Sequence, residues 1–434
     1  MHPRISLTLL AALVSACGGD PAVGEGGAET TGAESTTALT SGEPTTGELT
    51  STGTPTDTGS TSDGTTGSAN TTTSESSTSL ESSTSSATSE TGSDEIIYPD
   101  PEWQPGAPED HGLSSEGLAA MATVAEKMDS NCLVVTQGGV LVGEWYWNGF
   151  DANKDQENVY SVTKSITSAL VGIAADLGQL GQLGIEAPTG FPEWAGTDSD
   201  LIKIRNLISN DSGREWDFNG DYIGLTLAPD QTQYAVDRKH AKPIGTWWEY
   251  NNAAIQTLER VLATATASDV AVYVQDHLFK SIGMTASMGH DNEGNPLTYQ
   301  GVSASCRDLA RFGYLYLRKG RWAGGVQVVP EAWVAESLQP STTHNTAYGF
   351  MWWLNYPGHW ILPSVPLRSE GDGKLVPKAP NEIFAAVGAF GQFIVVDPTT
   401  DSVWVRLGPT DLADSSGFGK FPQLWDAFEA AQLP

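Results

Sequence analysis

Residues 160–180 read Tyr-Ser-Val-Thr-Lys-Ser-Ile-Thr-Ser-Ala-Leu-Val-Gly-Ile-Ala-Ala-Asp-Leu-Gly-Gln-Leu. Apolar side chains recur along this stretch at the three- and four-residue spacing of a helix that buries one face. They are Val162, Ile166, Ala169, Leu170, Ile173, Ala174 and Leu177. The spacing therefore predicts a core helix that begins near Ser161, and the rest of the fold is expected to form around it.

The first turn of this predicted helix carries two chemically active side chains. Ser161 and Lys164 are three residues apart, so they project from one face about one turn apart. The unpaired N–H groups and the dipole of a helix N-terminus favour negative charge close to Ser161. A serine that attacks a carbonyl group needs a proton acceptor and donors for the oxyanion. The alternative is that Ser161 is only a helix cap, because Ser-x-x-Lys is also found by chance in many helices.

The composition divides the chain into three parts. Residues 1–17 have a basic start and a short apolar run, and residues 18–96 are rich in Ser, Thr, Gly and acidic residues. All 14 tryptophans lie in residues 97–434, which are therefore the part that can bury a core. We expect residues 18–96 to be a disordered, flexible tether.

The net charge indicates which partners the protein can bind, and the N-terminal residues indicate where it is located. The formal net charge is -31, which argues against nucleic acid as a partner, because binding phosphates requires clustered Lys and Arg. The apolar run in residues 1–17 is too short to span a bilayer and is typical of an export signal. Val14-Ser15-Ala16-Cys17 resembles the lipobox of bacterial lipoproteins. We therefore expect an exported protein held to a membrane through lipidated Cys17; ordinary signal cleavage is the alternative.

Two further cysteines, Cys132 and Cys306, lie in the folded part. A disulfide is possible between them in an exported chain, but two buried free thiols fit the sequence nearly as well. Sequence alone gives no distance between them.

Predicted hairpins flank a helical middle. Residues 132–137 and 140–147 form one hairpin around Gly138-Gly139, and residues 392–397 and 402–407 form another. Helices are expected at residues 111–128, 253–267, 269–282, 305–318, 330–338 and 421–431. Gly283 and Gly320 are placed to end two of them. This order predicts an α+β fold, in which strands from both ends of the chain complete one antiparallel sheet.

Four phrases occur in an order that resembles the serine beta-lactamase-like family, which includes class C beta-lactamases, DD-peptidases, family VIII esterases and 6-aminohexanoate-dimer hydrolases. They are Ser161-Val-Thr-Lys-Ser165, Pro243-Ile-Gly-Thr-Trp-Trp-Glu-Tyr-Asn-Asn252, Arg307-Asp-Leu-Ala-Arg-Phe-Gly313 and Tyr348-Gly-Phe-Met-Trp-Trp353. The resemblance covers residues 110–430. It implies the beta-lactamase/DD-peptidase-like fold, with an antiparallel sheet flanked by helices and a mostly helical subdomain.

The resemblance also implies roles for individual residues. Ser161 would be the acyl-accepting nucleophile, Lys164 its charged neighbour and Tyr250 the proton shuttle, with Asn252 completing Tyr-x-Asn. A free phenol has a pKa of roughly 10. We expect an adjacent ammonium to lower the pKa of Tyr250 and make it a usable base.

The third motif of the family departs from its beta-lactamase form. Lys-Thr-Gly does not occur in this chain, and residues 384–392, Phe-Ala-Ala-Val-Gly-Ala-Phe-Gly-Gln, resemble the form of the esterase and amide-hydrolase branch. Backbone N–H groups at Ser161 and near Gly388 and Ala389 would then bind the oxyanion. Without the lysine that helps to bind a substrate carboxylate, ester or amide hydrolysis ranks above cleavage of penicillins or cell-wall peptides.

The sequence therefore predicts a serine hydrolase that cleaves a small ester or amide through an acyl-enzyme on Ser161, with no metal and no organic cofactor. The alternatives are a DD-peptidase or beta-lactamase, and a surface binding or sensor lipoprotein without turnover. Gly-x-Ser-x-Gly, His-Glu-x-x-His, Walker and paired Cys-x-x-Cys motifs do not occur. The oligomeric state is left open.

Some side chains are weaker candidates for the pocket. Tyr348, Trp352 and Trp353 are expected to wall the cleft, with core packing as the role of at least one of them. Asp217, Tyr222 and Asp291 are possible neighbours of the site. The histidines are read as solvated or structural.

Overall fold

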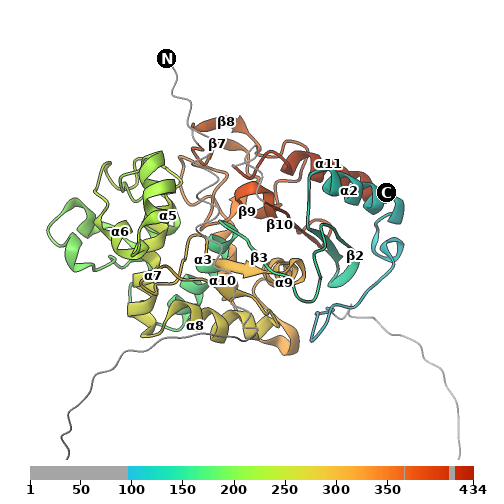
Figure 1. Cartoon of the computed structure of the whole chain (residues 1–434), viewed down its shortest axis with the longest axis horizontal. Coiled ribbons are helices and arrows are strands. Elements are labelled where there is room, and N and C mark those ends of the chain that lie inside the picture. The colour runs from blue at the N-terminus through green and yellow to red at the C-terminus, as the bar shows by residue number, and fades with distance from the viewer. Residues whose placement is uncertain (1–95, 366, 410–415) are drawn as a thin grey trace, which may run out of the picture. The chain divides into compact units, whose positions relative to one another are not determined.

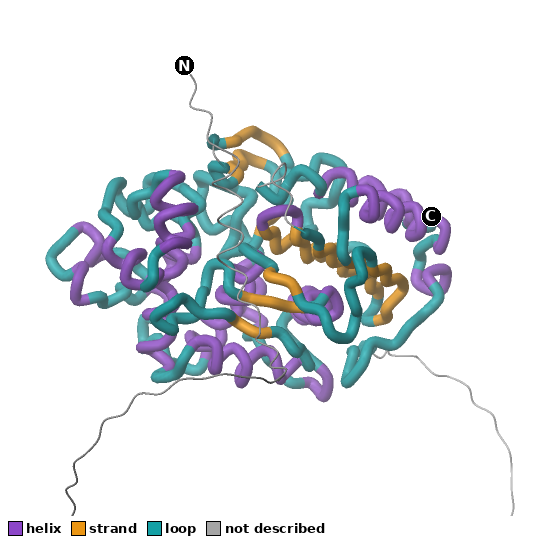
Figure 2. Tube along the Cα trace, in the orientation of Figure 1, coloured by secondary structure: helices purple, strands orange, loops and turns teal. Residues whose placement is uncertain are grey.

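A six-stranded antiparallel sheet in the order β2-β1-β11-β10-β9-β6 joins early and late parts of the chain (Figures 1 and 2). The computed structural model describes residues 96–365, 367–409 and 416–434. The predicted signal peptide, Cys17 and all but the last residue of the predicted tether lie outside the described residues. The strands of this sheet are β1 Cys132–Gln137, β2 Val140–Tyr146, β6 Trp353–Leu354, β9 Phe384–Gly388, β10 Gln392–Asp397 and β11 Ser402–Leu407.

The smaller strands form two further sheets. One is a three-stranded sheet of β3 Glu157–Asn158, β5 Val302–Ala304 and β4 Ser287–Met288, and the other pairs β7 Gly358–Leu362 with β8 Ser369–Gly373. The α-helices are α2 Ser115–Lys127, α3 Val162–Asp176, α4 Ile204–Ile208, α5 Leu225–Leu227, α6 Gln231–Asp237, α7 Asn252–Thr266, α8 Val270–Val274, α9 Cys306–Leu317, α10 Glu331–Ser337 and α11 Phe421–Ala431. Shorter helical turns are η1 Pro108–His111, η2 Gly184–Glu186, η3 Pro192–Trp194, η4 Asp198–Leu201, η5 Asn219–Gly224, η6 Gln275–Phe279, η7 Lys280–Ile282, η8 Ala323–Gly325 and η9 Ala389–Gly391.

Both predicted hairpins form, and β1 pairs with β11 so that Cys132 lies opposite Leu407. The prediction of one antiparallel sheet completed by strands from both ends is confirmed. Gly138 and Gly139 make the β1–β2 turn with φ of 60° and 85°. Only glycine adopts this left-handed backbone without strain, which explains the two-residue turn.

Helices cover both faces of the sheet. Successive side chains of a strand point to opposite faces, and in β10 and β11 the side chains on both faces are buried. Phe393 and Trp404 face α11, where their rings contact Phe421. On the other face α9 comes so close that a Cβ at Gly313 would lie 2.7 Å from Val403 and 2.8 Å from Ile394. Figure 1 shows α2 and α11 together on one side of the sheet and α9 on the other.

A mostly helical subdomain lies beside the sheet, with α5, α6 and α7 grouped at the left of Figure 1 and α3 between them and the strands. The predicted helix at residues 269–282 is not uniform. It is α8, then a π-helical turn at η6 and a 3-10 turn at η7. The turn ends at Gly283 with φ of 69°, as the glycine signal predicted.

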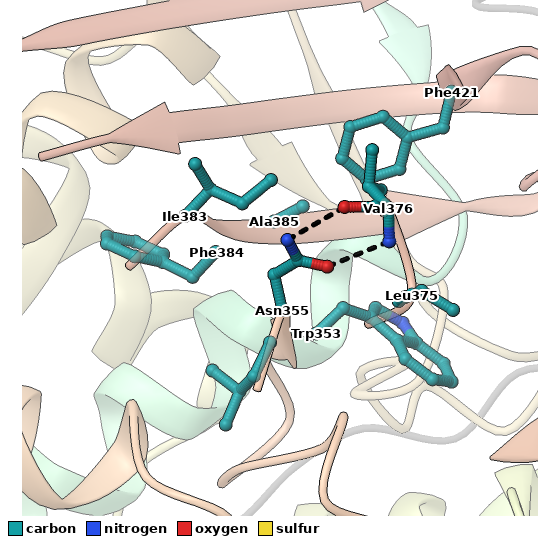
Figure 3. A pocket seen from close by; sticks show the side chains of 9 residues that line it. Trp353, Asn355, Leu375, Val376, Ile383, Phe384, Ala385 and Phe421 are labelled. Carbon is teal, nitrogen blue, oxygen red and sulfur yellow. Dashed lines mark hydrogen bonds between the residues drawn. The ribbon is translucent and has the colours of Figure 1, made fainter. Parts of the chain in front are cut away.

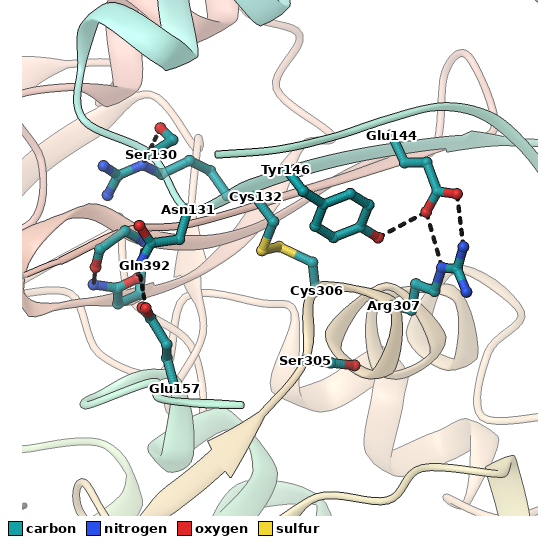
Figure 4. The surroundings of a disulfide bond; sticks show 12 residues. Ser130, Asn131, Cys132, Glu144, Tyr146, Glu157, Ser305, Cys306, Arg307 and Gln392 are labelled. Carbon is teal, nitrogen blue, oxygen red and sulfur yellow. Dashed lines mark hydrogen bonds and ion pairs between the residues drawn. A yellow bond between two sulfur atoms is a disulfide. The ribbon is translucent and has the colours of Figure 1, made fainter. Parts of the chain in front are cut away.

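Cys132 and Cys306 form a disulfide that ties β1 to the start of α9 (Figure 4). Beside it, Arg307 donates to both carboxylate oxygens of Glu144 on β2, at 2.8 and 2.6 Å. The free-thiol alternative is therefore wrong. Because β5 directly precedes α9 and pairs with β3, this clamp also supports the strand that leads into residues 160–176.

Candidate active site

A turn with a strained backbone at Tyr160 places Ser161 at the start of α3. Tyr160 has φ of 47°, a conformation unfavourable for a tyrosine. It is held by a hydrogen bond from its N–H to Asn158 Oδ1 at 2.7 Å and by edge-on packing of its ring against Phe390. Ser161 is the N-cap residue of α3, but its side chain makes no cap hydrogen bond. The hydroxyl is therefore not used as a helix cap.

Lys164 lies next to this hydroxyl. Its Nζ is 2.7 Å from Ser161 Oγ and donates to Tyr299 O at 2.9 Å. The side chain is 1% exposed, although lysine is almost never fully buried in proteins without a partner. A buried amine in contact with a serine hydroxyl is suited to exchanging a proton with it.

Tyr250 reaches the same point from the segment that leads into α7, 89 residues further along the chain. Its hydroxyl is hydrogen-bonded to Ser161, and Lys164 Nζ lies 4.8 Å from the centre of its ring. Asn251, which follows Tyr250, caps α7 by accepting from Ala254 N at 2.8 Å. The structure thus brings together the three predicted catalytic side chains.

The pKa of Tyr250 is raised, whereas the sequence analysis expected the ammonium of Lys164 to lower it. Burial lowers the pKa of Lys164 to about 7, although the charge of Asp221 opposes this shift. Burial also raises the pKa of Tyr250, and this outweighs its hydrogen bond with Ser161. An ion pair of ammonium and phenolate is disfavoured because both charged forms lose their hydration. Lys164, and not Tyr250, is therefore the group that changes protonation near neutral pH.

Asp221 completes the buried cluster, and the sequence analysis did not identify it. Its carboxylate accepts from Asn252 N and Nδ2 at 3.1 and 2.9 Å and from Ala253 N at 2.8 Å. Trp216 Nε1 adds a fourth bond at 3.2 Å. Burial nevertheless raises the pKa of Asp221 to about 6. No local motif marks this residue, since its partners at the start of α7, Asn252 and Ala253, lie 31 and 32 positions away in the chain.

Asn252 lies behind Tyr250, where its amide donates to Asp221. It is 4% exposed and lies outside the set of residues that line the pocket at Ser161. Its predicted contact with substrate stays a prediction, and its observed contacts position the start of α7.

The third motif lies where the resemblance implies. Gly388 ends β9 and Ala389 begins the following turn. A Cβ on Gly388 would lie 2.3 Å from Val159 O, two residues before Ser161, so the two chain segments meet at a distance that only glycine permits. Arg406 donates to Phe390 O and Gly391 O at 3.0 and 2.9 Å and fixes this turn.

A small pocket opens on Ser161. It is lined by Ser161, Tyr222, Tyr250, Trp353, Pro363, Val365, Val387, Ala389, Ser416 and Phe418. Among these described residues there is no Lys, Arg, His, Asp or Glu. The described lining is therefore uncharged, with both polar and apolar side chains, and these residues offer a substrate carboxylate no cation.

The weaker candidates divide between pocket and core. Trp353 and Tyr222 line the pocket, whereas Trp352 is fully buried between Phe312 and Tyr316. Tyr348 packs edge-on against Tyr250. Asp217 is paired with Arg238. The expectation that at least one aromatic packs in the core is confirmed.

A second, smaller pocket lies on the other side of Trp353, around Asn355 (Figure 3). Asn355 Nδ2 donates to Val376 O at 3.0 Å, and Val376 N donates to Asn355 Oδ1 at 2.8 Å. These bonds fix the chain that returns from β8 against β6. Within the described part of the chain, no three His, Cys, Asp or Glu side chains gather as metal ligands would. No helix of that part is long and apolar enough to cross a membrane.

Comparison with known proteins agrees with this geometry. Residues 119–414 match the family model described as Beta-lactamase. The chain belongs to the Beta-lactamase family. The matched range includes all three predicted catalytic residues and the third motif.

Similar proteins in this family are diverse. The 6-aminohexanoate-dimer hydrolase of Paenarthrobacter ureafaciens is 24% identical over 331 residues, which are 70% of this chain and 79% of that protein. A penicillin-binding protein homologue from Caulobacter crescentus has a similar fold, with a TM-score of 0.54, 14% identity and coverage of 74% of this chain and 99% of that one. EstCE1, a hydrolase with promiscuous acyltransferase activity, gives a TM-score of 0.55 at 15% identity and covers 72% and 100% of the two chains. These likenesses confirm the predicted beta-lactamase/DD-peptidase-like fold.

Proposed function

We propose that this Beta-lactamase family member is a serine hydrolase that cleaves small, uncharged esters or amides through an acyl-enzyme on Ser161. The observation that carries the proposal is the 2.7 Å contact between Lys164 Nζ and Ser161 Oγ, because Ser161 lines a pocket whose described residues are uncharged. Membership of the family and the similarity to a 6-aminohexanoate-dimer hydrolase support hydrolysis.

Acylation would begin with the neutral amine of Lys164. As Ser161 Oγ attacks the carbonyl carbon of the substrate, its proton passes to Lys164 Nζ. The carbonyl oxygen becomes an oxyanion, which the backbone N–H groups of Ser161 and Ala389 would bind. The Tyr250 hydroxyl then gives its proton to the leaving alcohol or amine and regains one from Lys164, so the acyl-enzyme forms with both side chains neutral.

Deacylation would use the same groups in reverse. A water molecule takes the place of the leaving group and loses its proton to the Tyr250 and Lys164 pair while its oxygen attacks the acyl carbon. Collapse of the second oxyanion breaks the bond to Ser161 Oγ, which regains a proton. The carboxylic acid leaves, and no cofactor is needed at any step.

The uncharged lining supports a substrate without a carboxylate next to the scissile bond. Penicillins and cell-wall peptides carry one, and the described lining residues include no cation to bind it. Desolvating that carboxylate without a partner would be costly. Hydrolysis of neutral esters or amides is therefore the function that the geometry supports best.

The test is covalent labelling of the purified protein. A fluorophosphonate probe should add one adduct by intact mass, and peptide mapping should place it on Ser161. The Ser161→Ala protein should take up none, and it should lose hydrolysis of p-nitrophenyl acetate. Labelling by a fluorescent penicillin and inertness toward the esters would instead favour the DD-peptidase or beta-lactamase alternative. Inertness toward all three probes would favour the non-catalytic alternative.

A further inference from the structure

The outer wall of the Ser161 pocket comes from the connection between β7 and β8. Pro363 and Val365 line the pocket, and Ser364 between them is 3% exposed. These three residues, 363–365, are called the rim segment below. A connection of this kind lies on the surface in most proteins, so burial of its serine indicates that the segment is docked.

The chain on either side of the rim segment is fixed independently. Asn345 Nδ2 donates to Ile361 O at 2.9 Å, two residues before it. Asn355 exchanges two hydrogen bonds with Val376 on the returning side (Figure 3). The end of β7 and the chain after β8 are therefore held by contacts that do not involve Glu249.

The tip is held by Glu249, the residue that directly precedes Tyr250. Ser364 Oγ donates to Glu249 Oε1 at 3.1 Å, and Arg368 Nη1 donates to Glu249 Oε2 at 3.2 Å. Arg368 Nη1 also donates to Trp248 O at 3.3 Å, and its guanidinium stacks on the Trp247 ring at 4.6 Å. The Glu249 side chain is only 13% exposed, so these charge-assisted bonds are sheltered from water.

Resting on the proposed function, we propose that Glu249 is a specificity-determining residue: by holding the rim segment against the pocket, it excludes bulky acyl groups from Ser161. The wild-type enzyme then prefers compact, uncharged acyl groups such as acetyl. Releasing the rim segment enlarges the pocket without changing Ser161, Lys164 or Tyr250. The effect is one of positioning, because Glu249 does not line the pocket.

The experiment compares Glu249→Gln and Ser364→Ala with wild type. Glu370→Gln is the matched control, because Glu370 also accepts from Arg368, at 2.7 Å, but does not contact the rim segment. The kcat/KM ratio of p-nitrophenyl trimethylacetate to p-nitrophenyl acetate should rise roughly tenfold in both test variants. A roughly tenfold change is the lower end of the discrimination that one methylene group produces in a hydrophobic pocket. It should stay at the wild-type value in Glu370→Gln.

A second readout does not depend on catalysis. Amide hydrogen exchange in peptides spanning residues 358–373 should be faster in Glu249→Gln and Ser364→Ala than in the control. Unchanged exchange, an unchanged ratio with acetate still hydrolysed, or an equal rise in Glu370→Gln would each overturn this inference and leave the proposed function standing. Failure of the wild-type protein to react with any ester or fluorophosphonate would overturn both.

Discussion

At the scale of single residues, two opposing effects set the pKa of Lys164. Burial favours the neutral amine, and the negative charge of Asp221 favours the ammonium. Lys164 Nζ lies 4.8 Å from the centre of the Tyr250 ring, and burial favours the neutral form of each side chain. Asp221 opposes this for Lys164, because its charge raises the lysine pKa. The resulting pKa of about 7 allows Lys164 to act as a base at neutral pH, the condition for efficient general base catalysis.

This balance predicts the pH dependence of hydrolysis. In wild type, kcat/KM for an uncharged ester should rise with pH through about 7, as Lys164 loses its proton. In Asp221→Asn the rise should occur at lower pH, because losing a nearby negative charge makes the ammonium less favourable and lowers the lysine pKa further. The measurement is the pH profile of kcat/KM for both proteins.

Asp217→Asn is the control for this shift, since Asp217 is paired with Arg238. Its profile should coincide with that of wild type. A pH profile that does not move in Asp221→Asn would show that Asp221 does not set the lysine pKa. A general loss of activity without a shift would leave Asp221 only a structural role at the start of α7.

At the scale of elements, the proposed mechanism requires the end of β9 and the start of α3 to meet. They come from parts of the chain more than 200 residues apart, and they touch where Gly388 faces Val159 O. Arg406 on β11 holds the turn that follows. The oxyanion donors proposed here, Ser161 N and Ala389 N, are therefore positioned by the sheet and by the strained turn at Tyr160.

Gly388→Ala tests this contact. Its Cβ would lie 2.3 Å from Val159 O, so one segment must move, and a shift of about 1 Å in a pre-organised site costs about 100-fold in rate. We expect kcat for p-nitrophenyl acetate to fall by about that factor. Gly289→Ala is the matched control, because its Cβ would meet Gly301 O at an ordinary 3.5 Å. Equal kcat in the two variants would contradict the proposed position of the donors.

At the scale of the whole folded unit, the disulfide closes a loop of 174 residues that contains Ser161, Lys164 and Tyr250. The bond links β1, where this loop begins, to the first residue of α9, where the loop ends (Figure 4). Disulfides persist in oxidising compartments. The pair therefore supports the proposal that the protein is exported.

Cys132→Ala/Cys306→Ala tests the contribution of this bond to stability. We expect the free energy of unfolding to fall by about 2–4 kcal/mol, because the unfolded chain gains conformational freedom. Thermal unfolding with and without reductant measures the change. Reductant should lower the Tm of wild type and leave that of the double variant unchanged. Equal melting of the two proteins without reductant would contradict a stabilising disulfide.

Much of the fold could be predicted from sequence because its signals are local. The terminal hairpin and the last helix form with the predicted bounds, since strand alternation, turn residues and helical spacing lie within each segment. The β7–β8 hairpin was not predicted. Its second strand, Ser369–Gly373, is polar and mostly exposed, so it has no apolar alternation to reveal it.

The sequence by itself determined the α+β class and the residues Ser161, Lys164 and Tyr250, because periodicity and motif order are properties of the chain. The tertiary structure alone decided that Asp221 lies in the buried cluster near Lys164, that Glu249 bonds to the rim segment, and that burial lowers the pKa of Lys164. Those features arise from desolvation and from contacts between distant segments. Neither exists until the chain has folded and removed these side chains from water.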